Sequence, residues 1–412
     1  MQPNLTDARF YTGDPYPTYR WLRNHAPVYW DATSKLWGLS RYTDVEYVSK
    51  TPSLFSAAQG VLPDSDALVS IVCMDAPRHL RLRNLVNKGF TPRMVGKLEP
   101  KVRALAAEIL DRVAVRGSCD LVRDVAVPLP LYIIAEMLGI PRADFDRFHE
   151  WSDRLISVAG NYDDPEIAAS ATSAYVEYGS YLKAIFEDRR RGPREDLTSI
   201  LVAAQRDGML AEDEEAMEND EIVMFMTLLL VAGNETTRNA IAGGMLALME
   251  HPAQRELLQR RPELIDSAVE EILRYVTPIV CFRRTATQDT EVGGQPIRAG
   301  ERVLLLYQSA NRDESVFSDP EKFDITRDPN PHLAFGIGPH FCLGANLARM
   351  ELRVMIEAIL ARFPDIRLAD GESAQRMAST LVRGIAKLPV QFTSPSNRGV
   401  VSRPVGSSAC RP

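Results

Sequence analysis

Apolar residues recur with helical spacing along most of the chain, and glycines and prolines interrupt the pattern. This periodicity predicts a mainly helical protein. Predicted helices cover residues 14–24, 43–50, 78–88, 93–115, 125–138, 143–158, 165–190, 197–205, 262–275 and 345–363. Residues 57–73 have no periodicity, and we expect them to form a covering loop.

The longest predicted helix runs from about residue 218 to residue 250 and ends before Pro252. Residues 228–232 are apolar on nearly all sides, as in a helix that crosses a core. The polar segment 233–238, G-N-E-T-T-R, follows in mid-helix. Buried polar groups need partners, and a threonine can bend a helix by bonding to the preceding turn. The segment is therefore either a polar kink without chemistry or part of a functional site.

Strand patterns are confined to the two ends of the chain. Two short runs suggest a hairpin, and turn-punctuated strands follow the later helices. The strand segments are 28–30, 36–39, 279–306 with a turn at 292–295, 366–368 and 382–392. No shift in composition marks a linker. We therefore expect one mainly α domain with small β-sheets (α+β) over residues 1–394, and a loose tail over 395–412.

Charge and cysteine content narrow the function classes. The chain has 48 basic and 55 acidic residues, a net charge of −7, which argues against a nucleic-acid partner. Its five scattered cysteines include no C-x-x-C pair and fit reduced thiols in a cytoplasmic protein. The N-terminus lacks an apolar signal segment, and the longest apolar run, 222–232, is too short to span a bilayer.

A glycine-dense loop, F-G-I-G-P-H-F-C-L-G over 335–344, places Cys342 just before the helix 345–363. Glycines allow close backbone approach to a flat ligand, and a helix N-terminus stabilises a thiolate. A thiolate held in this way suits an axial metal ligand. Taken alone, the loop is more simply a turn that holds a small buried cysteine.

Two charged pairs also allow two interpretations. His79 and Arg83 are four residues apart and share a helix face. They are either solvated or donors to a buried anion such as a carboxylate. Glu271 and Arg274, spaced i, i+3, contribute little on a surface but would form an anchor if buried.

Four motifs occur together: F-G-x-G-x-H-x-C-x-G at 335–344, A-G-N-E-T-T at 232–237, E-I-L-R at 271–274 and H-L-R-L-R at 79–83. In this order and spacing, the sequence resembles the cytochrome P450 superfamily of haem-thiolate monooxygenases in its soluble bacterial form. The resemblance covers residues 11–392. It implies a long central helix over a haem and the cysteine loop beneath it.

The resemblance implies haem b (iron protoporphyrin IX) as cofactor, with Cys342 as the thiolate ligand of iron. Phe335 would pack near the sulfur, and glycines including Gly344 would let loop N–H groups point at it. The residues implied for the haem propionates are His79, Arg83, His340 and one of Arg283 and Arg284, with Arg284 favoured.

Glu235 and Thr236 match the family's acid–alcohol pair, which delivers protons during activation of O2. The peroxide-using branch of the family carries Arg-Pro at this site, unlike this chain. Glu271 and Arg274, with Arg327 as a third member, match a structural anchor behind the haem.

The family's layout also implies an apolar pocket, which suits a lipophilic substrate. The residues that it assigns to the pocket are Val61, Leu68, Val72, Leu228, Ile279, Val280 and Leu381. Several of these could equally be core residues.

The blocks at 231–239, 309–317 and 329–336 most resemble bacterial enzymes that oxidise the terminal carbons of cholesterol-type side chains and methyl-branched lipids. Asn234 is a local departure, since many relatives have His or Asp there. The implied reaction inserts one oxygen atom from O2 into a C–H bond of a steroid side chain, branched lipid or terpenoid.

Electrons would come from NAD(P)H through a separate ferredoxin reductase and ferredoxin, because the sequence shows no fused redox domain. Arg78, Arg81, Lys88 and Arg349 are candidates for steering an acidic ferredoxin or are ordinary surface charges. Two alternatives stay open: a non-hydroxylating haem-thiolate biosynthetic enzyme (desaturation, coupling or rearrangement) and a non-catalytic haem protein that binds a ligand.

Overall fold

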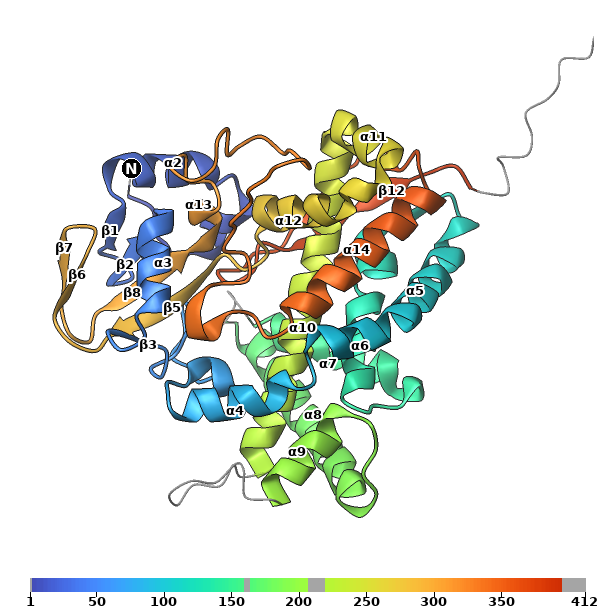
Figure 1. Ribbon diagram of the computed structural model, residues 1–412, viewed down its shortest axis with the longest axis horizontal. Helices are drawn as coiled ribbons and strands as arrows, with labels where there is room; N and C mark the ends of the chain where they lie inside the picture. Colours follow the sequence, from blue (N-terminus) through green and yellow to red (C-terminus); the bar gives the residue numbers. More distant parts are fainter. Residues whose placement is uncertain (1, 159–163, 207–218, 395–412) are drawn as a thin grey trace, which may run out of the picture.

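The computed structural model describes residues 2–158, 164–206 and 219–394, and it is mainly helical, as predicted (Figure 1). The predicted tail and the expected helix start at residue 218 lie outside these residues. The α-helices are α1 (Ala8–Thr12), α2 (Tyr16–His25), α3 (Tyr42–Lys50), α4 (Arg78–Asn87), α5 (Pro92–Ala114), α6 (Pro128–Met137), α7 (Phe145–Ile156), α8 (Pro165–Arg191), α9 (Leu197–Arg206), α10 (Asn219–Glu250), α11 (Pro252–Arg260), α12 (Ile265–Val276), α13 (Tyr307–Ala310) and α14 (Ala345–Arg362).

The strands are short, and in the described residues all but β4 come before residue 57 or after residue 280. They are β1 (Val28–Asp31), β2 (Leu36–Leu39), β3 (Phe55–Ser56), β4 (Ser118–Asp120), β5 (Cys281–Ala286), β6 (Thr290–Val292), β7 (Gln295–Ile297), β8 (Arg302–Leu306), β9 (Arg367–Leu368), β10 (Gln375–Arg376), β11 (Ile385–Lys387) and β12 (Pro389–Gln391). The hairpin predicted at 28–39 and the hairpin turn predicted at 292–295 are both present, in the antiparallel pairs β1–β2 and β6–β7.

One sheet, in the order β1-β2-β8-β5-β3, joins the N-terminal hairpin to strands from late in the chain. The pair β2–β8 is parallel, and the other pairs are antiparallel. Side chains alternate between the two faces of β8. Val303 and Leu305 pack in one buried cluster with α3, whereas Leu304 and Leu306 pack in another with α1 and α2. The N-terminal hairpin is therefore fixed to the late strand β8.

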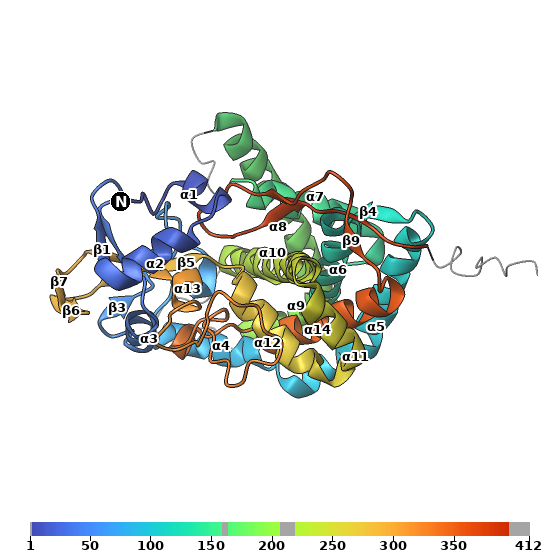
Figure 2. The same cartoon turned by 90° about the horizontal axis from the view of Figure 1, so that it is seen from above.

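Helix α10 crosses the centre of the molecule, and Figure 2 shows it end-on, surrounded by other helices. It contacts α6, α8, α12 and α14. Its apolar side chains, among them Met226, Leu230 and Ile241, are buried in the main core cluster. Within the described ranges, no helix has the length and apolarity needed to cross a bilayer.

The structure differs from the predicted pattern most clearly after α10. A proline marks the predicted end of the long helix, but Pro252 also begins α11. Proline fits the first helical turn because the N–H it lacks would have no partner there. The predicted helix 14–24 is also accompanied by a separate α1, and the predicted strand 382–392 divides into β11 and β12.

Candidate functional site

The cysteine loop is held closed by backbone hydrogen bonds. The N–H of Cys342 donates to the carbonyl of Phe335 at 2.8 Å. Gly336 and Gly338 have φ angles of +67° and +80°, in the region that favours glycine. A Cβ at Gly338 would lie 2.5 Å from the carbonyl oxygen of Ser49. Glycine is therefore required at position 338 for the loop to pack on α3.

Gly344 is different, because its φ is not positive and a Cβ there would meet no protein atom within 4 Å. Packing within the chain therefore does not explain this glycine, whereas a flat group lying against the loop would. The loop leads directly into α14, which places Cys342 at a helix N-terminus. Burial raises the pKa of its thiol, while the Gly344 N–H, Arg83 and Arg349 favour the thiolate.

A cluster of basic side chains lies beside the loop. The rings of His79 and His340 stack with centroids 4.0 Å apart. Burial lowers the pKa of both histidines, and Arg83 and Arg284 lower both further; the pKa of His340 falls to about 3. Arg83 also donates to the carbonyl of Phe341. Within the described residues none of these four side chains forms an ion pair with a carboxylate. The cluster thus fits an anionic group from outside the chain.

Arg283 and Arg284 lie on β5 and have different partners. Arg283 donates to the carbonyl of Gln59 at 2.7 Å and forms an ion pair with Asp66, also at 2.7 Å. Its side chain therefore holds the covering loop. Arg284 donates to the Arg283 carbonyl at 2.7 Å, and its charge acts on His79 and His340. The structure places Arg284, rather than Arg283, in the basic cluster.

One face of α10 is less buried than the rest of the helix. Leu228, Ala232 and Thr236, at intervals of four residues, share this face and are partly or largely exposed. The hydroxyl of Thr236 donates to the carbonyl of Ala232 at 2.8 Å, the bond to the preceding turn that its position suggested. This face combines apolar side chains with one hydroxyl.

Glu235 lies on another side of α10, because adjacent helical residues do not face the same way. It is 2% exposed and forms an ion pair with Arg238 at 2.5 Å. Asn239 donates to its Oε1 at 2.8 Å. Burial raises the pKa of Glu235, and Arg238 and Asn239 partly oppose this. The Glu235 carboxyl and the Thr236 hydroxyl therefore belong to adjacent residues but contact different groups: Arg238 and Asn239 in one case, the Ala232 carbonyl in the other.

Arg238 links this buried carboxyl to the surface. Its Nη1 donates to Asp153 at 3.1 Å, and the side chain of Asp153 is 48% exposed. Sequence reasoning missed Arg238 and Asn239 as partners of Glu235, although their i+3 and i+4 spacing is a signal that could have identified them. Asn234, the departure from the family pattern, donates to the Ser152 hydroxyl at 3.0 Å.

The predicted anchor residues form one buried network. Arg274 donates from Nε and Nη2 to the two oxygens of Glu271, each at 2.8 Å, and both side chains have no exposed surface. Arg327 donates to Glu271 at 3.2 Å, and Asn330 does so at 3.1 Å. Arg274 also donates to backbone carbonyls at 311, 320 and 322. The network ties α12 to the segment that leads into the cysteine loop.

A second network adjoins it. Arg349 donates to both oxygens of Glu270 at 2.7 and 2.9 Å, and His332 lies 3.1 Å from the same carboxylate. Burial alone would raise the pKa of Glu270, but Arg349 and His332 lower it to about 2. The guanidinium of Arg349 lies 4.5 Å from the centre of the Phe335 ring. Arg349, for which the sequence left open a steering charge or an ordinary surface charge, is thus engaged in supporting the loop.

The seven predicted pocket residues do not share one environment. Val61 is buried near Val72, and Leu228, Ile279 and Leu381 are partly buried. Leu68 is 58% exposed. Val280 has no exposed surface and packs with Tyr11, Tyr19 and Leu304, so it is a core residue. The strand-like run 279–282 gave both Ile279 and Val280 the same apolar signal, although they occupy different clusters.

These observations test whether the site fits a haem. Among the described residues, no three His, Cys, Asp or Glu side chains gather as a metal site, so Cys342 lacks companion ligands of that kind. A single thiolate ligand suits a metal whose remaining ligands come from a flat cofactor. The space beside Gly344, where a Cβ would meet no protein atom, would accommodate such a cofactor. The basic cluster fits the carboxylates of such a cofactor. The residues present therefore fit a haem.

Comparisons with known proteins agree with this geometry. The Cytochrome P450 family model matches residues 162–391. The steroid C26-monooxygenase of Mycobacterium tuberculosis is 42% identical over 392 residues, which cover 95% of this chain and 97% of that protein. The methyl-branched lipid omega-hydroxylase of the same species is 41% identical over 395 residues and 90% of each chain.

Two solved structures have the same fold. The Mycobacterium marinum cytochrome P450 in complex with pseudoionone matches with a TM-score of 0.87 and 35% identity, over 94% of this chain and 98% of that chain. CYP109E1 from Bacillus megaterium, in complex with testosterone, matches with a TM-score of 0.84 and 35% identity, over 93% and 99%.

Proposed function

Because the chain belongs to the cytochrome P450 family and is a monooxygenase, we propose that it oxidises a terminal C–H bond of a branched aliphatic chain. A steroid side chain or a methyl-branched lipid would carry this bond, and one oxygen atom of O2 would be inserted into it. The proposal rests on two relatives above 40% identity, whose names specify steroid C26 and the omega position of a branched lipid. The apolar face of α10 around Leu228 is compatible with either substrate.

Cys342 would hold the haem iron as a thiolate, and Phe335 and the loop N–H groups would shield the sulfur. His79, Arg83, Arg284 and His340 would hold the propionates through charge-assisted hydrogen bonds. When bound, haem supplies the iron centre on which O2 is reduced and activated. The Glu270 and Glu271 networks would keep the loop in place from behind.

Thr236 and Glu235 would divide the delivery of protons between them. The Thr236 hydroxyl donates to Ala232, which leaves its oxygen lone pairs free to accept a hydrogen bond from water on the exposed face of α10. Burial raises the pKa of Glu235, and a carboxyl group can both accept and donate a proton at this position. Arg238 pairs with both Glu235 and the exposed Asp153, and because a guanidinium stays protonated, it would position the Glu235 carboxyl rather than carry the proton.

We further propose that electrons arrive from NAD(P)H through a ferredoxin reductase and an acidic ferredoxin in the cytoplasm. Free thiols at Cys73, Cys119, Cys281 and Cys342 support a reducing compartment. Lys88 follows α4 and is exposed, and Leu80 and Phe341 add exposed apolar area near the basic cluster. Lys88→Glu should slow reduction by ferredoxin and reduce its dependence on salt; unchanged kinetics would place docking elsewhere.

Titration of the haem-loaded protein with a sterol, a methyl-branched fatty acid, a terpenoid and a polyketide tests the substrate class. A high-spin shift in absorbance with the sterol or branched acid, and a product with one added oxygen atom at a chain end, is expected. A shift only with the terpenoid or polyketide would overturn the proposal. Leu228→Trp should lower the affinity for the lipid, measured from this shift, about tenfold or more, because the larger side chain would fill the space beside this face of α10. Val115→Trp, at a site 74% exposed, is the matched control.

A further inference from the structure

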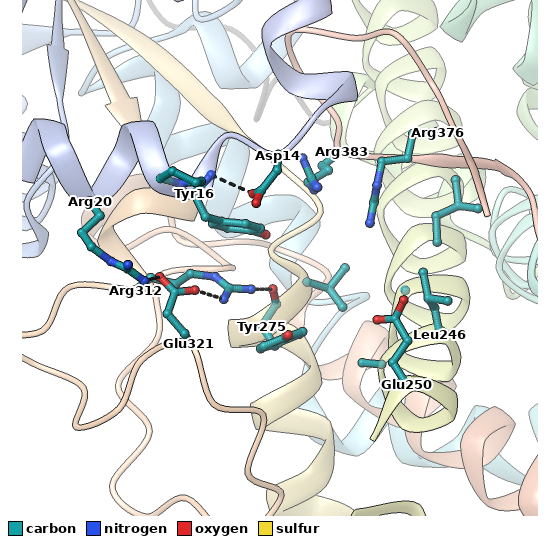
Figure 3. Close-up of a pocket in the computed structure, with 15 residues that line it drawn as sticks. Asp14, Tyr16, Arg20, Leu246, Glu250, Tyr275, Arg312, Glu321, Arg376 and Arg383 are labelled. Atoms are coloured by element: carbon teal, nitrogen blue, oxygen red, sulfur yellow. Dashed lines mark hydrogen bonds and ion pairs between the residues drawn. The ribbon is translucent and has the colours of Figure 1, made fainter. Parts of the chain in front are cut away.

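A separate cavity of ≈ 400 Å³ lies between α2, the last turns of α10, the end of α12 and the segment of β10 and β11 (Figure 3). Leu246 is among its lining residues and lies on α10 beyond Thr236. The two positions are about 15 Å apart along the helix axis, at 1.5 Å per residue. The cavity is therefore distinct from the face of α10 assigned to the substrate.

Arg312 forms one wall of the cavity and is fixed on several sides. Its guanidinium carbon lies 3.8 Å from the centre of the Tyr16 ring and 4.3 Å from that of Tyr275. It forms an ion pair with Glu321 at 2.7 Å, and Arg20 pairs with the same carboxylate at 3.0 Å. The negative charge of Glu321 is thus already shared by two arginines.

Arg376 and Arg383 supply two further positive charges, and Figure 3 shows both beside the cavity. Arg383 is 8% exposed and uses Nη1 to donate to the carbonyls of Tyr11 and Gly13. Arg376 is exposed, and no ion pair within 4 Å joins it to a carboxylate of the described residues. A ligand from solvent can therefore approach two adjacent guanidinium groups.

The acidic groups on this cavity do not neutralise the pair. Glu250 and Asp14 act on Arg376 at longer range. Asp14 also accepts a hydrogen bond from the Tyr16 N–H at 3.1 Å. The lining includes four arginines and three acids, Asp14, Glu250 and Glu321. The lining therefore carries one more positive than negative side chain, and Arg376 and Arg383 are the two arginines of the lining that form no ion pair with a carboxylate of the described residues.

We propose that this cavity binds a small oxyanion, a carboxylate or phosphate, between Arg376 and Arg383. The paired N–H donors of a guanidinium group match the oxygens of a planar carboxylate or a tetrahedral phosphate. The rings of Tyr16 and Tyr275, held by Arg312, form an aromatic wall for the remainder of the ligand. The site adds a second binding function to the protein and does not depend on the identity of the oxidised substrate.

Calorimetric titration of the haem-loaded protein with inorganic phosphate and, separately, with succinate tests this site, at ionic strength held constant with NaCl. Binding of phosphate assigns the site to phosphate-type ligands, and binding of succinate alone assigns it to carboxylates. Arg376→Gln should lower the affinity for the anion about tenfold or more, because a charge-assisted contact is lost. Arg260→Gln, an exposed arginine on α11 outside the cavity, should leave the affinity unchanged.

Glu250→Gln provides a test of opposite sign, because removing this acid should strengthen anion binding severalfold. A variant that merely loosened the fold would not tighten binding. The proposal is overturned if neither anion binds the wild-type protein, or if Arg376→Gln and the wild type bind the anion equally well.

Discussion

Glu271 and Arg274 lie one turn apart on α12, and two hydrogen bonds of 2.8 Å join side chains that have no exposed surface. Glu271 also accepts a hydrogen bond from the N–H of Asp324 at 2.8 Å. A buried ion pair stays intact only when its remaining donors and acceptors are satisfied. The hydrogen bonds of Glu271 and Arg274 to Asp324 and Pro320 attach α12 to the irregular segment before the cysteine loop.

Replacing Glu271 with glutamine should strongly destabilise the protein. The charge of Arg274 would stay buried without its counter-ion, which costs about 3–5 kcal/mol. Denaturant unfolding of the haem-loaded protein measures the loss. The control is Glu263→Gln, which removes an exposed pair with Arg261 and should cost far less stability. Equal losses in the two variants would show that the buried network does not support the fold.

Thr236→Ala should separate electron consumption from product formation. The variant keeps the helix but lacks the hydroxyl on the exposed face of α10, so product per electron should fall about tenfold or more, with release of hydrogen peroxide. Thr236→Ser keeps the hydroxyl and should stay close to wild type. The ratio of product to electrons consumed is obtained by measuring NAD(P)H oxidation, product formation and peroxide release in the same reaction. Unchanged coupling in the alanine variant would assign proton delivery to another group.

Arg284→Gln and Arg283→Gln should have different effects, although the two residues are adjacent. Loss of Arg284 removes one cation from the His79–His340 cluster, so haem should dissociate about tenfold faster. Loss of Arg283 removes the contacts to Gln59 and Asp66, and the covering loop should become easier to cleave by protease. Haem transfer to an acceptor protein and limited proteolysis separate these effects. Faster haem loss from the Arg283 variant alone would contradict the assignment.

Glu351 on α14 should make stability depend on pH. It is 2% exposed, its Oε1 has no hydrogen-bond partner in the described part of the chain, and burial raises its pKa from 4.5 to about 8. The folded state therefore binds more protons than the unfolded state between these values. Its stabilising effect is complete below pH 4.5 and is lost as pH rises through about 8.

The loss over that window should reach a few kcal/mol, since each pKa unit corresponds to about 1.4 kcal/mol. Glu351→Gln removes the titrating group and should flatten this part of the curve of unfolding free energy against pH. Glu357→Gln, on the same helix at 33% exposure, should leave the slope in place. A slope that persists in the Glu351 variant would assign it to other groups.

Periodicity and motif order were sufficient to predict the main helices, the two hairpins and the family. These signals are local or depend on spacing along the chain, so they survive without coordinates. Pro252 shows where a local signal is ambiguous, since proline can follow the end of one helix and begin the next. The end of α10 was predicted correctly, but helix α11, which the same proline begins, was missed.

Pairings between distant segments were harder to predict. Glu270 meets Arg349 only because α12 and α14 pack together, and no local rule identifies that contact. The choice between Arg283 and Arg284 depended on strand β5, where neighbouring side chains point to opposite faces. Val280 and Leu68 show the same limit, because apolar character does not distinguish a core, a pocket and a surface.

The spectrum of the reduced protein with carbon monoxide tests the central claim most directly. If Cys342 is the thiolate ligand of a haem, the wild-type protein should show the red-shifted Soret band of thiolate ligation. Cys342→Ser should lose that band, whereas Cys119→Ser, at a cysteine away from the loop, should retain it. A wild-type spectrum without the shifted band, or a shifted band that survives in Cys342→Ser, would contradict the account.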